Sequence, residues 1–294
     1  MVRLGDHGER VGCKIRGRKV DLVAGDEVVL EPDRAAHTAE RWVVVERLPR
    51  RNVLQRTDSR GFDEPLVANL DQLGIVVAPR PASDPFMIDR YMAGAGYADI
   101  PVLLILNKRD LLEAEPPVAG SEFDFLETYR KLKVPLVAVS AKHRIGLDSL
   151  IEQLRGRRTL LAGQSGVGKS SLTNALGATV LRATSELSEG SGEGRHTTVS
   201  SAILSLPWGE LTDSPGVRDY APPVVALKDV QRGFEEIRQA SAGCRFQDCL
   251  HLREPQCAVQ AAATGGDIDP RRLESYRRLL NLTRQLDEKR GWRT

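Results

Sequence analysis

The chain has 294 residues, with 41% hydrophobic and 28% charged side chains and a formal net charge of +2. This length suits two or three domains, and the composition is typical of a soluble globular protein and excludes disordered and fibrous classes. No apolar run approaches the ~20 residues that span a bilayer, and the charged beginning of the chain lacks the apolar core of a signal peptide. We therefore expect a cytoplasmic protein with no membrane contact.

The first 60 residues contain short segments rich in Val and Leu, bounded by Gly, Asp and Pro, at 19–32 and 41–49. Such segments are typical of strands, and a small all-β barrel of the oligonucleotide-binding (OB) type fits them. The region is short for five strands, so we expect its first strand to be missing or reduced. Basic residues outnumber acidic ones here and in 223–294, for example in KIRGRK at 14–19. That excess suits a polyanion such as nucleic acid, although solvated surface charge explains each cluster equally well.

From about residue 61 to 222 the pattern changes to apolar strands that alternate with helices. Continuous apolar runs are expected where both faces of a strand are buried, and helical patterns at 84–96 and 121–132 lie between them. The alternation predicts an α/β domain with a mostly parallel, helix-covered sheet. The expected strands are 71–79, 101–108, 134–140 and 158–163, and GELT at 209–212 is a further strand-like segment.

The last segment, 223–294, is expected to be mainly helical. Its longest helical pattern covers 269–290, with Asp269 as the N-cap and Pro270 at the first helical position. Three of the four cysteines of the chain fall within fourteen residues of this segment. In a cytoplasmic protein such a cluster favours a metal site over a set of disulfides.

The cysteine cluster has the spacing Cys-x4-Cys-x-His-x5-Cys. Three thiolates and one imidazole form the closed tetrahedral shell of a structural zinc ion, so we expect one Zn²⁺ and no catalysis there. Reduced buried cysteines beside an incidental histidine are the alternative. The remaining cysteine, Cys13, is interpreted as a small buried apolar side chain. The four expected ligands are Cys244, Cys249, His251 and Cys257.

The segment GQSGVGKS, residues 163–170, matches a phosphate-binding loop between an apolar strand and a helical segment. Its glycines allow backbone N–H groups to turn toward a phosphate, near the positive end of the following helix. Lys169 is expected to reach the β- and γ-phosphates, and the Ser170 hydroxyl to coordinate Mg²⁺. A glycine-rich turn without a ligand is the alternative. The residues expected at the phosphates are Gly163, Gln164, Ser165, Gly166, Val167, Gly168, Lys169, Ser170 and Ser171.

Two further motifs, NKRD at 107–110 and VSAKH at 139–143, follow predicted strands. The Asp110 carboxylate can accept two hydrogen bonds that guanine offers and adenine does not, and leaving it unpaired costs on the order of several kcal/mol. We expect Asn107 to hold the neighbouring loop and the base edge, and the stem of Lys108 to cover the purine face. Together the motifs predict GTP and GDP as ligands. The residues expected to meet the guanine oxygen through backbone N–H groups are Ser140, Ala141 and Lys142.

Two segments are expected to sense the γ-phosphate. The motif TDSPG, 212–216, offers Asp213 for the Mg²⁺-linked position and the Gly216 N–H for the γ-phosphate. The polar segment 187–201, rich in Gly and Ser, precedes it and offers a threonine hydroxyl that closes on Mg²⁺. The expected Mg²⁺ ligands are Ser170, Thr198 and Asp213, with Thr197 as the alternative to Thr198.

One residue that is common in GTPases is absent. Many of these enzymes place a water-orienting Gln just after Asp-x-x-Gly, and here that position is Val217. An apolar side chain cannot orient water, so another group must act, and His196 is the nearest candidate by motif. An exposed loop histidine without a catalytic role is the alternative. We expect slow intrinsic hydrolysis until a partner orders this segment.

Taken in the order NKRD, VSAK, GQSGVGKS, GRHTT, DSPG and then the cysteine cluster, the motifs resemble those of one family. This family comprises the circularly permuted, ribosome small-subunit-dependent GTPases of the RsgA type. The resemblance covers most of the chain. The resemblance implies an α/β P-loop GTPase with an N-terminal OB-like barrel and a C-terminal helical zinc-binding domain. The expected domains are 1–60, 61–222 and 223–294.

The resemblance also implies a function. It implies binding to the small (30S) ribosomal subunit and its rRNA late in maturation, GTP hydrolysis stimulated by that subunit, and then release. It supports His196 as the water-positioning residue, and we expect the protein to act as a monomer. Two other classes stay open on the residues alone. A metabolic kinase lacks an evident acceptor-binding element, and the intact Lys169 and Ser170 argue against a non-hydrolysing RNA-binding zinc protein.

Overall fold

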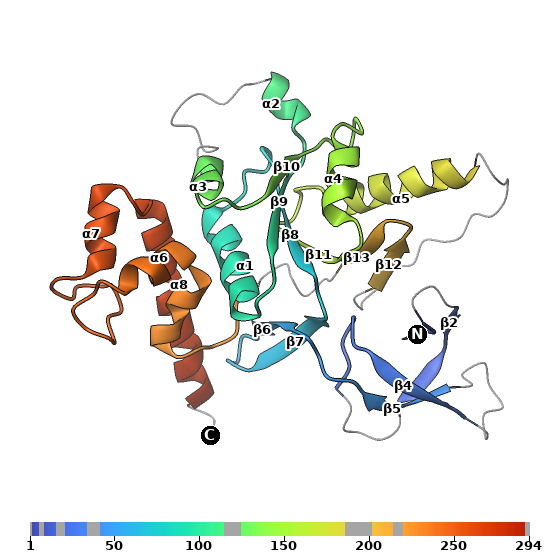
Figure 1. Cartoon of the computed structure of the whole chain (residues 1–294), viewed down its shortest axis with the longest axis horizontal. Helices are drawn as coiled ribbons and strands as arrows, with labels where there is room; N and C mark the ends of the chain where they lie inside the picture. The colour runs from blue at the N-terminus through green and yellow to red at the C-terminus, as the bar shows by residue number, and fades with distance from the viewer. Residues whose placement is uncertain are drawn as a thin grey trace.

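The computed structural model describes residues 2–5, 9–15, 21–33, 42–114, 125–185, 202–213 and 220–291. Figure 1 shows three groups of elements: the N-terminal strands in blue, a central sheet between helices, and the C-terminal helices in orange and red. The central sheet lies between the other two groups.

The central sheet has six strands in the order β10-β9-β8-β11-β13-β12. Neighbouring strands are parallel, except that β12 runs antiparallel to β13 at one edge. The predicted mostly parallel sheet is therefore confirmed. The edge strand β12 was not predicted, because its sequence AILSL lacks the continuous apolar run of a strand buried on both faces. The strands are β8 (Gln72–Val77), β9 (Val102–Leu106), β10 (Leu136–Ala138), β11 (Arg158–Ala162), β12 (Ala202–Leu206) and β13 (Gly209–Asp213).

Helices cover both faces of this sheet. Alternate residues of β8 point to opposite sides: Leu73 and Ile75 pack with α1 and α3, whereas Val76 packs with α4 and α5. Both faces are thus buried, as the apolar runs predict. No helix in the described part of the chain is long and apolar enough to cross a membrane. The helices are α1 (Pro85–Tyr97), α2 (Asp110–Ala114), α3 (Phe125–Lys131), α4 (Leu147–Leu154) and α5 (Lys169–Ser185).

The C-terminal region is helical, as predicted. The Asp269 carboxylate accepts a hydrogen bond from the Arg271 backbone N–H at 2.8 Å, which is the geometry of an N-cap. A buried apolar cluster, which includes Phe234 and Leu280, packs the region onto Ala93 of α1. The elements are η2 (Leu227–Gly233), α6 (Glu235–Ser241), α7 (Ala258–Gly265) and α8 (Pro270–Gly291).

The N-terminal region contains short strands in small sheets. A three-stranded sheet has the order β3-β5-β4, and β1 pairs with β2 in a separate hairpin. The OB-like barrel stays a prediction, as does a domain boundary at residue 60, which lies in the turn between β6 and β7. Cys13 is half-buried, so the expectation that it is a buried side chain was wrong. The strands are β1 (Val2–Arg3), β2 (Arg10–Val11), β3 (Cys13–Ile15), β4 (Val28–Pro32), β5 (Trp42–Arg47), β6 (Val53–Thr57) and β7 (Asp63–Ala68).

A candidate nucleotide site and a candidate metal centre

The predicted nucleotide motifs follow three strands of the central sheet. NKRD begins directly after β9, SAK follows β10, and GQSGVGKS begins directly after β11. Strands β10, β9, β8 and β11 are consecutive and parallel in the sheet, so their carboxyl ends share one edge. Ligands of open α/β sheets bind at that edge. The three motifs are therefore placed for a single site, although they are far apart in the chain.

The phosphate-binding loop needs glycine at specific positions. Gly163 has φ +137°, and a Cβ there would lie 2.3 Å from the Val76 carbonyl oxygen. Gly168 has φ +95°, and its Cβ would lie 2.5 Å from Nδ2 of Asn107. Both the backbone conformation and the lack of space exclude larger side chains. The loop thus folds tightly against β8 and against NKRD, and α5 begins at its last residues.

The Lys169 side chain folds back over this loop. Its Nζ donates hydrogen bonds to the carbonyl oxygens of Gly163 at 2.7 Å and Gln164 at 3.0 Å. The ammonium group is therefore held against the loop backbone, near the N-terminus of α5. A cation and a helix N-terminus together favour an anion at this position.

Asn107 connects the three motifs. Its side chain is 1% exposed. Nδ2 donates to the Val167 carbonyl oxygen at 3.0 Å, and Oδ1 accepts from the Ala141 backbone N–H at 3.1 Å. One buried amide thus fixes the phosphate loop on one side and the SAK motif on the other. The predicted role of holding the neighbouring loop agrees with this geometry.

Lys108 shows a contact that sequence reasoning missed. Its Nζ donates to the carbonyl oxygens of Gly166 and Arg80, each at 2.7 Å. Arg80 belongs to the loop 78–84 after β8, which also contacts the phosphate loop because Pro81 lies against Gly166. In the sequence, this contact is indicated only by the position of loop 78–84 directly after an expected strand, which places it at the same sheet edge as the nucleotide motifs. It carries no recognised nucleotide motif.

Asp110 has the properties of a base-reading carboxylate. Its Oδ1 is buried and has no hydrogen-bond partner among the described residues. Oδ2 lies 3.7 Å from Nε2 of His143. The pKa of Asp110 is held below its ordinary value, chiefly by a hydrogen bond with the Ser140 side chain, against the opposing effect of burial. The group is therefore an ionised acceptor with unused capacity, as guanine recognition requires.

The other predicted nucleotide residues differ in exposure. Ser140 is buried and closes a turn with Ile145, to which it gives and from which it receives a backbone hydrogen bond. Lys142 and the two serines at the start of α5, Ser170 and Ser171, are exposed. Their side chains are thus available to a ligand at the sheet edge.

Five predicted residues are described only in part or not at all. The backbone of Asp213 ends β13 and pairs with Leu161 of β11, which places it near the same edge, but its side chain is not described. The predicted residues that lie wholly outside the described part of the chain are His196, Thr197, Thr198 and Gly216.

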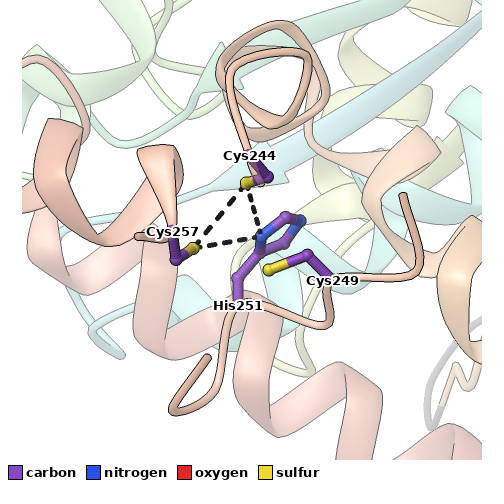
Figure 2. A group of neighbouring side chains, drawn as sticks. All are labelled: Cys244, Cys249, His251 and Cys257. Atoms are coloured by element: carbon purple, nitrogen blue, oxygen red, sulfur yellow. Dashed lines mark hydrogen bonds between the residues drawn. The ribbon is translucent and has the colours of Figure 1, made fainter. Parts of the chain in front are cut away.

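The predicted zinc ligands converge on one point (Figure 2). The ligand atoms of Cys244, Cys249, His251 and Cys257 all lie within 4.8 Å of one another. Sγ of Cys244 lies 3.8 Å from Sγ of Cys257, and Nδ1 of His251 lies 3.6 Å and 3.4 Å from these two sulfur atoms. Tetrahedral zinc with Zn–S bonds of about 2.3 Å sets its sulfur atoms about 3.8 Å apart. The donor set and its spacing therefore fit one zinc ion.

Residues around the cluster orient these ligands. Nε2 of His251 lies 3.1 Å from Oε1 of Gln231, so an Nε2–H donor leaves the Nδ1 lone pair facing the thiols. The Glu254 carboxylate accepts from the backbone N–H groups of Leu250 at 2.9 Å and Leu252 at 2.7 Å, which shapes the loop between the cysteines. Sequence reasoning missed Gln231, because it is twenty residues upstream in η2 and no local pattern marks it.

A family model described as RsgA GTPase matches residues 47–222 of this chain. Among curated proteins, the small ribosomal subunit biogenesis GTPase RsgA of Azotobacter vinelandii is 43% identical over 274 residues, which cover 93% of this chain and 78% of that protein. The protein of the same name from Pseudomonas aeruginosa is 42% identical, with 93% of this chain and 79% of that protein covered.

Two solved structures are similar over almost the whole chain. YjeQ from Thermotoga maritima matches with a TM-score of 0.70 and 28% identity, covering 95% of this chain and 92% of that chain. YloQ, described as a circularly permuted GTPase, matches with a TM-score of 0.70 and 25% identity, covering 95% and 88%. The reversed order of base-reading and phosphate-binding motifs along this chain agrees with that description.

Proposed function

The chain belongs to the RsgA GTPase family, and on that premise we propose that it acts in the late maturation of the small (30S) ribosomal subunit. Membership makes it a circularly permuted GTP hydrolase. In the proposal, the subunit and its rRNA bind the protein, stimulate GTP hydrolysis, and are released after it. The observation that carries the proposal is similarity along 93% of the chain to proteins named for small-subunit biogenesis.

Guanine selection is assigned to the loops around Asn107. The Asp110 carboxylate accepts hydrogen bonds from N1–H and the 2-amino group of guanine, which supplies partners for its buried oxygen. The stem of Lys108 covers the purine face, and its ammonium group already ties the base-reading loop to the phosphate loop. Backbone N–H groups of the SAK motif, from Ser140 to Lys142, meet the guanine oxygen.

The phosphates are assigned to the loop 163–171. Its N–H groups and the Lys169 ammonium bind the β- and γ-phosphate oxygens. Mg²⁺ supplies positive charge at these oxygens when it is bound. Its protein ligands are expected to be Ser170, Thr198 (or Thr197) and Asp213. Ser170 lies in the first turn of α5 beside this loop, and the backbone of Asp213 lies near the same edge, which supports both assignments.

Hydrolysis needs a positioned water, and we assign that task to His196 because Val217 cannot perform it. The water oxygen attacks the γ-phosphorus, the bond to the β–γ bridging oxygen breaks, and phosphate and GDP form. The Gly216 N–H is expected to hold a γ-phosphate oxygen. If the subunit positions His196 at this water, its binding raises the rate of turnover.

The cysteine cluster is assigned one structural zinc ion. Four protein ligands fill a tetrahedral shell and leave no position for a substrate, so the ion stabilises the C-terminal helices. The proposed domains, 1–60, 61–222 and 223–294, then place the GTPase between two regions with an excess of basic residues. Such regions suit the phosphate backbone of rRNA. We propose that the protein acts as a monomer in the cytoplasm.

The test is phosphate release from GTP and from ATP, with and without purified small ribosomal subunits. We expect GTP turnover to rise strongly with the subunit and ATP turnover to stay negligible. A non-hydrolysing protein would release no phosphate in either case, and a metabolic kinase would ignore the subunit. Turnover of ATP equal to that of GTP, or indifference to the subunit, would overturn the proposal.

A second test isolates base reading. The substitution Asp110→Asn replaces an acceptor by an amide that donates, which matches the 2-oxo group of xanthine better than the 2-amino group of guanine. We expect GDP affinity to fall by at least about tenfold and xanthosine diphosphate affinity to rise. Equal affinity of the parent protein and this variant for GDP would contradict the assigned role of Asp110.

A further inference from the structure

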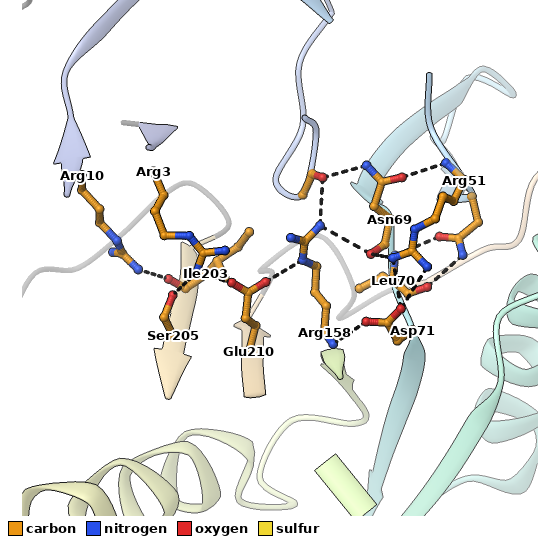
Figure 3. A network of polar contacts seen from close by, with 12 residues as sticks. Arg3, Arg10, Arg51, Asn69, Leu70, Asp71, Arg158, Ile203, Ser205 and Glu210 are labelled. Carbon is orange, nitrogen blue, oxygen red and sulfur yellow. Dashed lines mark hydrogen bonds and ion pairs between the residues drawn. The ribbon is translucent and has the colours of Figure 1, made fainter. Parts of the chain in front are cut away.

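The N-terminal hairpin β1–β2 contacts the edge hairpin β12–β13 of the GTPase sheet (Figure 3). The Arg3 guanidinium forms an ion pair with Glu210 of β13 and donates to Oγ of Ser205 of β12 at 2.9 Å. Ser205 and Glu210 are direct partners across the two strands. Arg10 donates to the Ile203 carbonyl oxygen at 2.5 Å. Two arginines of the first strands thus hold both strands of the edge hairpin.

The Glu210 carboxylate lies between two arginines. Its Oε2 is 2.7 Å from Nε of Arg158 in β11, and the side chains of Glu210 and Arg158 are 16% and 17% exposed. Arg158 also donates to the Gly25 carbonyl oxygen in the N-terminal region at 3.1 Å. Because the carboxylate is partly shielded from water, its ion pairs are stronger than fully exposed ones. Glu210 therefore links the sheet and the N-terminal strands.

The hairpin β12–β13 also joins the two segments expected to sense the γ-phosphate. Residue 202, the first of β12, directly follows the segment 187–201 that contains His196. Asp213, the last residue of β13, is three positions after Glu210 and directly precedes residues 214–216. A shift of this hairpin along β11 would therefore move residues 202 and 213, to which these two segments are attached.

We propose that Arg3 and Arg10 are positioning residues for GTP hydrolysis, which act through the β12–β13 hairpin. RNA that binds the N-terminal strands would change the contacts of Arg3 and Arg10 with the hairpin. RNA binding would in this way affect the rate of hydrolysis at the nucleotide site. This inference rests on the proposed function, because RNA of the subunit is the partner that it requires.

Other contacts attach the N-terminal region to the rest of the protein without the hairpin. Asn69 donates through Nδ2 to the Gly25 carbonyl oxygen at 2.9 Å, and Arg51 pairs with Asp71 of the GTPase region at 3.0 Å. Removal of Arg3 and Arg10 therefore leaves the region attached. A change in catalysis after their removal reports on the hairpin rather than on loss of the whole region.

The experiment uses the full chain with Arg3→Ala, Arg10→Ala and the double substitution. Arg51→Ala is the matched control. It also removes a guanidinium group, but Arg51 pairs with Asp71 and not with a residue of the hairpin. Arg3→Lys keeps a cation for Glu210. The measurements are kcat at saturating small subunits, the subunit concentration for half-maximal stimulation, intrinsic GTP turnover, GDP affinity, and amide hydrogen exchange of residues 202–213.

We expect the double variant to lose at least about fivefold in subunit-stimulated kcat, with faster amide exchange in 202–213 and unchanged GDP affinity. Arg3→Lys should recover part of the loss, and Arg51→Ala should change kcat less than twofold, as roughly expected for a distant surface site. Three results would overturn the inference. The double variant could have the same subunit-stimulated kcat as the parent, Arg51→Ala could lose as much kcat as the double variant, or Arg3→Lys could recover none of the loss. If the parent itself showed no stimulation, the proposed function would fail instead.

Discussion

Asn107 donates from its buried side-chain amide to the Val167 carbonyl oxygen, 3.0 Å away, and so joins the base-reading loop to the phosphate-binding loop. These loops come from β9 and β11, which are separated in the sheet by β8. Because the junction depends on the sheet edge and not on chain order, it is compatible with the permuted order of the motifs. The proposed nucleotide site is therefore the part of the fold that the permutation leaves in place.

The substitution Asn107→Ala should therefore damage both loops. It leaves the Ala141 N–H and the Val167 carbonyl oxygen without their partner, at a cost of about 1–3 kcal/mol for each buried group. We expect GDP affinity to fall at least about tenfold and the free energy of unfolding to fall as well. Isothermal titration with GDP and chemical denaturation measure these effects. Asn174→Ala on the exposed side of α5 is the control, and an equal loss there would argue against the bridging role of Asn107.

The sequence predicts where the nucleotide motifs lie in the fold, because each motif is local. Strand β9 and residues 107–110 are adjacent in the chain. An apolar run followed by four residues is therefore enough to predict that NKRD lies at the carboxyl end of a strand. The loop 78–84 and Gln231 have no such local signal, and their contacts with Lys108 and His251 arise only when the chain folds. The edge strand β12 was missed because Ser205 interrupts its short apolar run, and both Leu204 and Ser205 are exposed.

Gln231 should tune the metal centre that the cysteines form. Its amide oxygen fixes the His251 ring through Nε2, and loss of such a supporting hydrogen bond lowers metal affinity by about 10–100-fold. We expect Gln231→Ala to show this loss in competition with a chromogenic zinc chelator, whereas Cys257→Ser should lose the bound ion altogether. Gln239→Ala on α6 and Cys13→Ser are the matched controls. Unchanged zinc affinity in Gln231→Ala would contradict the role given to this residue.

A buried ion pair fastens the C-terminal helices to the GTPase region. Arg272 of α8 and Asp89 of α1 are 2% and 0% exposed at a distance of 2.7 Å, and Arg272 also pairs with Glu236 at 2.6 Å. Removing one partner of a buried pair costs about 3–5 kcal/mol. Asp89 keeps a second pair, with Arg271 at 3.0 Å, so the lower end of that range applies here. We expect that loss for Arg272→Ala in urea denaturation, at constant protein concentration.

Arg278 on the same helix provides the comparison for this prediction. It pairs with Glu274 at 3.0 Å, but both side chains are more than half exposed. Water screens such a pair, so Arg278→Ala should cost less than about 1 kcal/mol. Similar losses in the two variants would mean that the Arg272 pair does not fasten the two regions.

The contact between Glu210 and the N-terminal strands should depend on pH. Burial by itself raises the pKa of Glu210, but hydrogen bonds and attraction from Arg158 and Arg3 outweigh it and hold the pKa below the ordinary value of 4.5. A carboxyl group whose pKa is lower in the folded than in the unfolded protein stabilises the fold when it is ionised. That stabilisation is complete above pH 4.5 and is lost as the pH falls through the lowered pKa of the folded state.

Glu210→Gln removes the charge at every pH, so its effect should follow this titration. We expect the free energy of unfolding of the variant to be lower than that of the parent between pH 5 and 8, and the difference to shrink below the ordinary pKa as the parent itself is protonated. Chemical denaturation at a series of pH values measures the difference. Glu152→Gln, which removes an exposed partner of Arg155, should barely change stability. A difference for Glu210→Gln that stays constant below pH 4 would mean that ionisation of this carboxylate does not stabilise the hairpin contact.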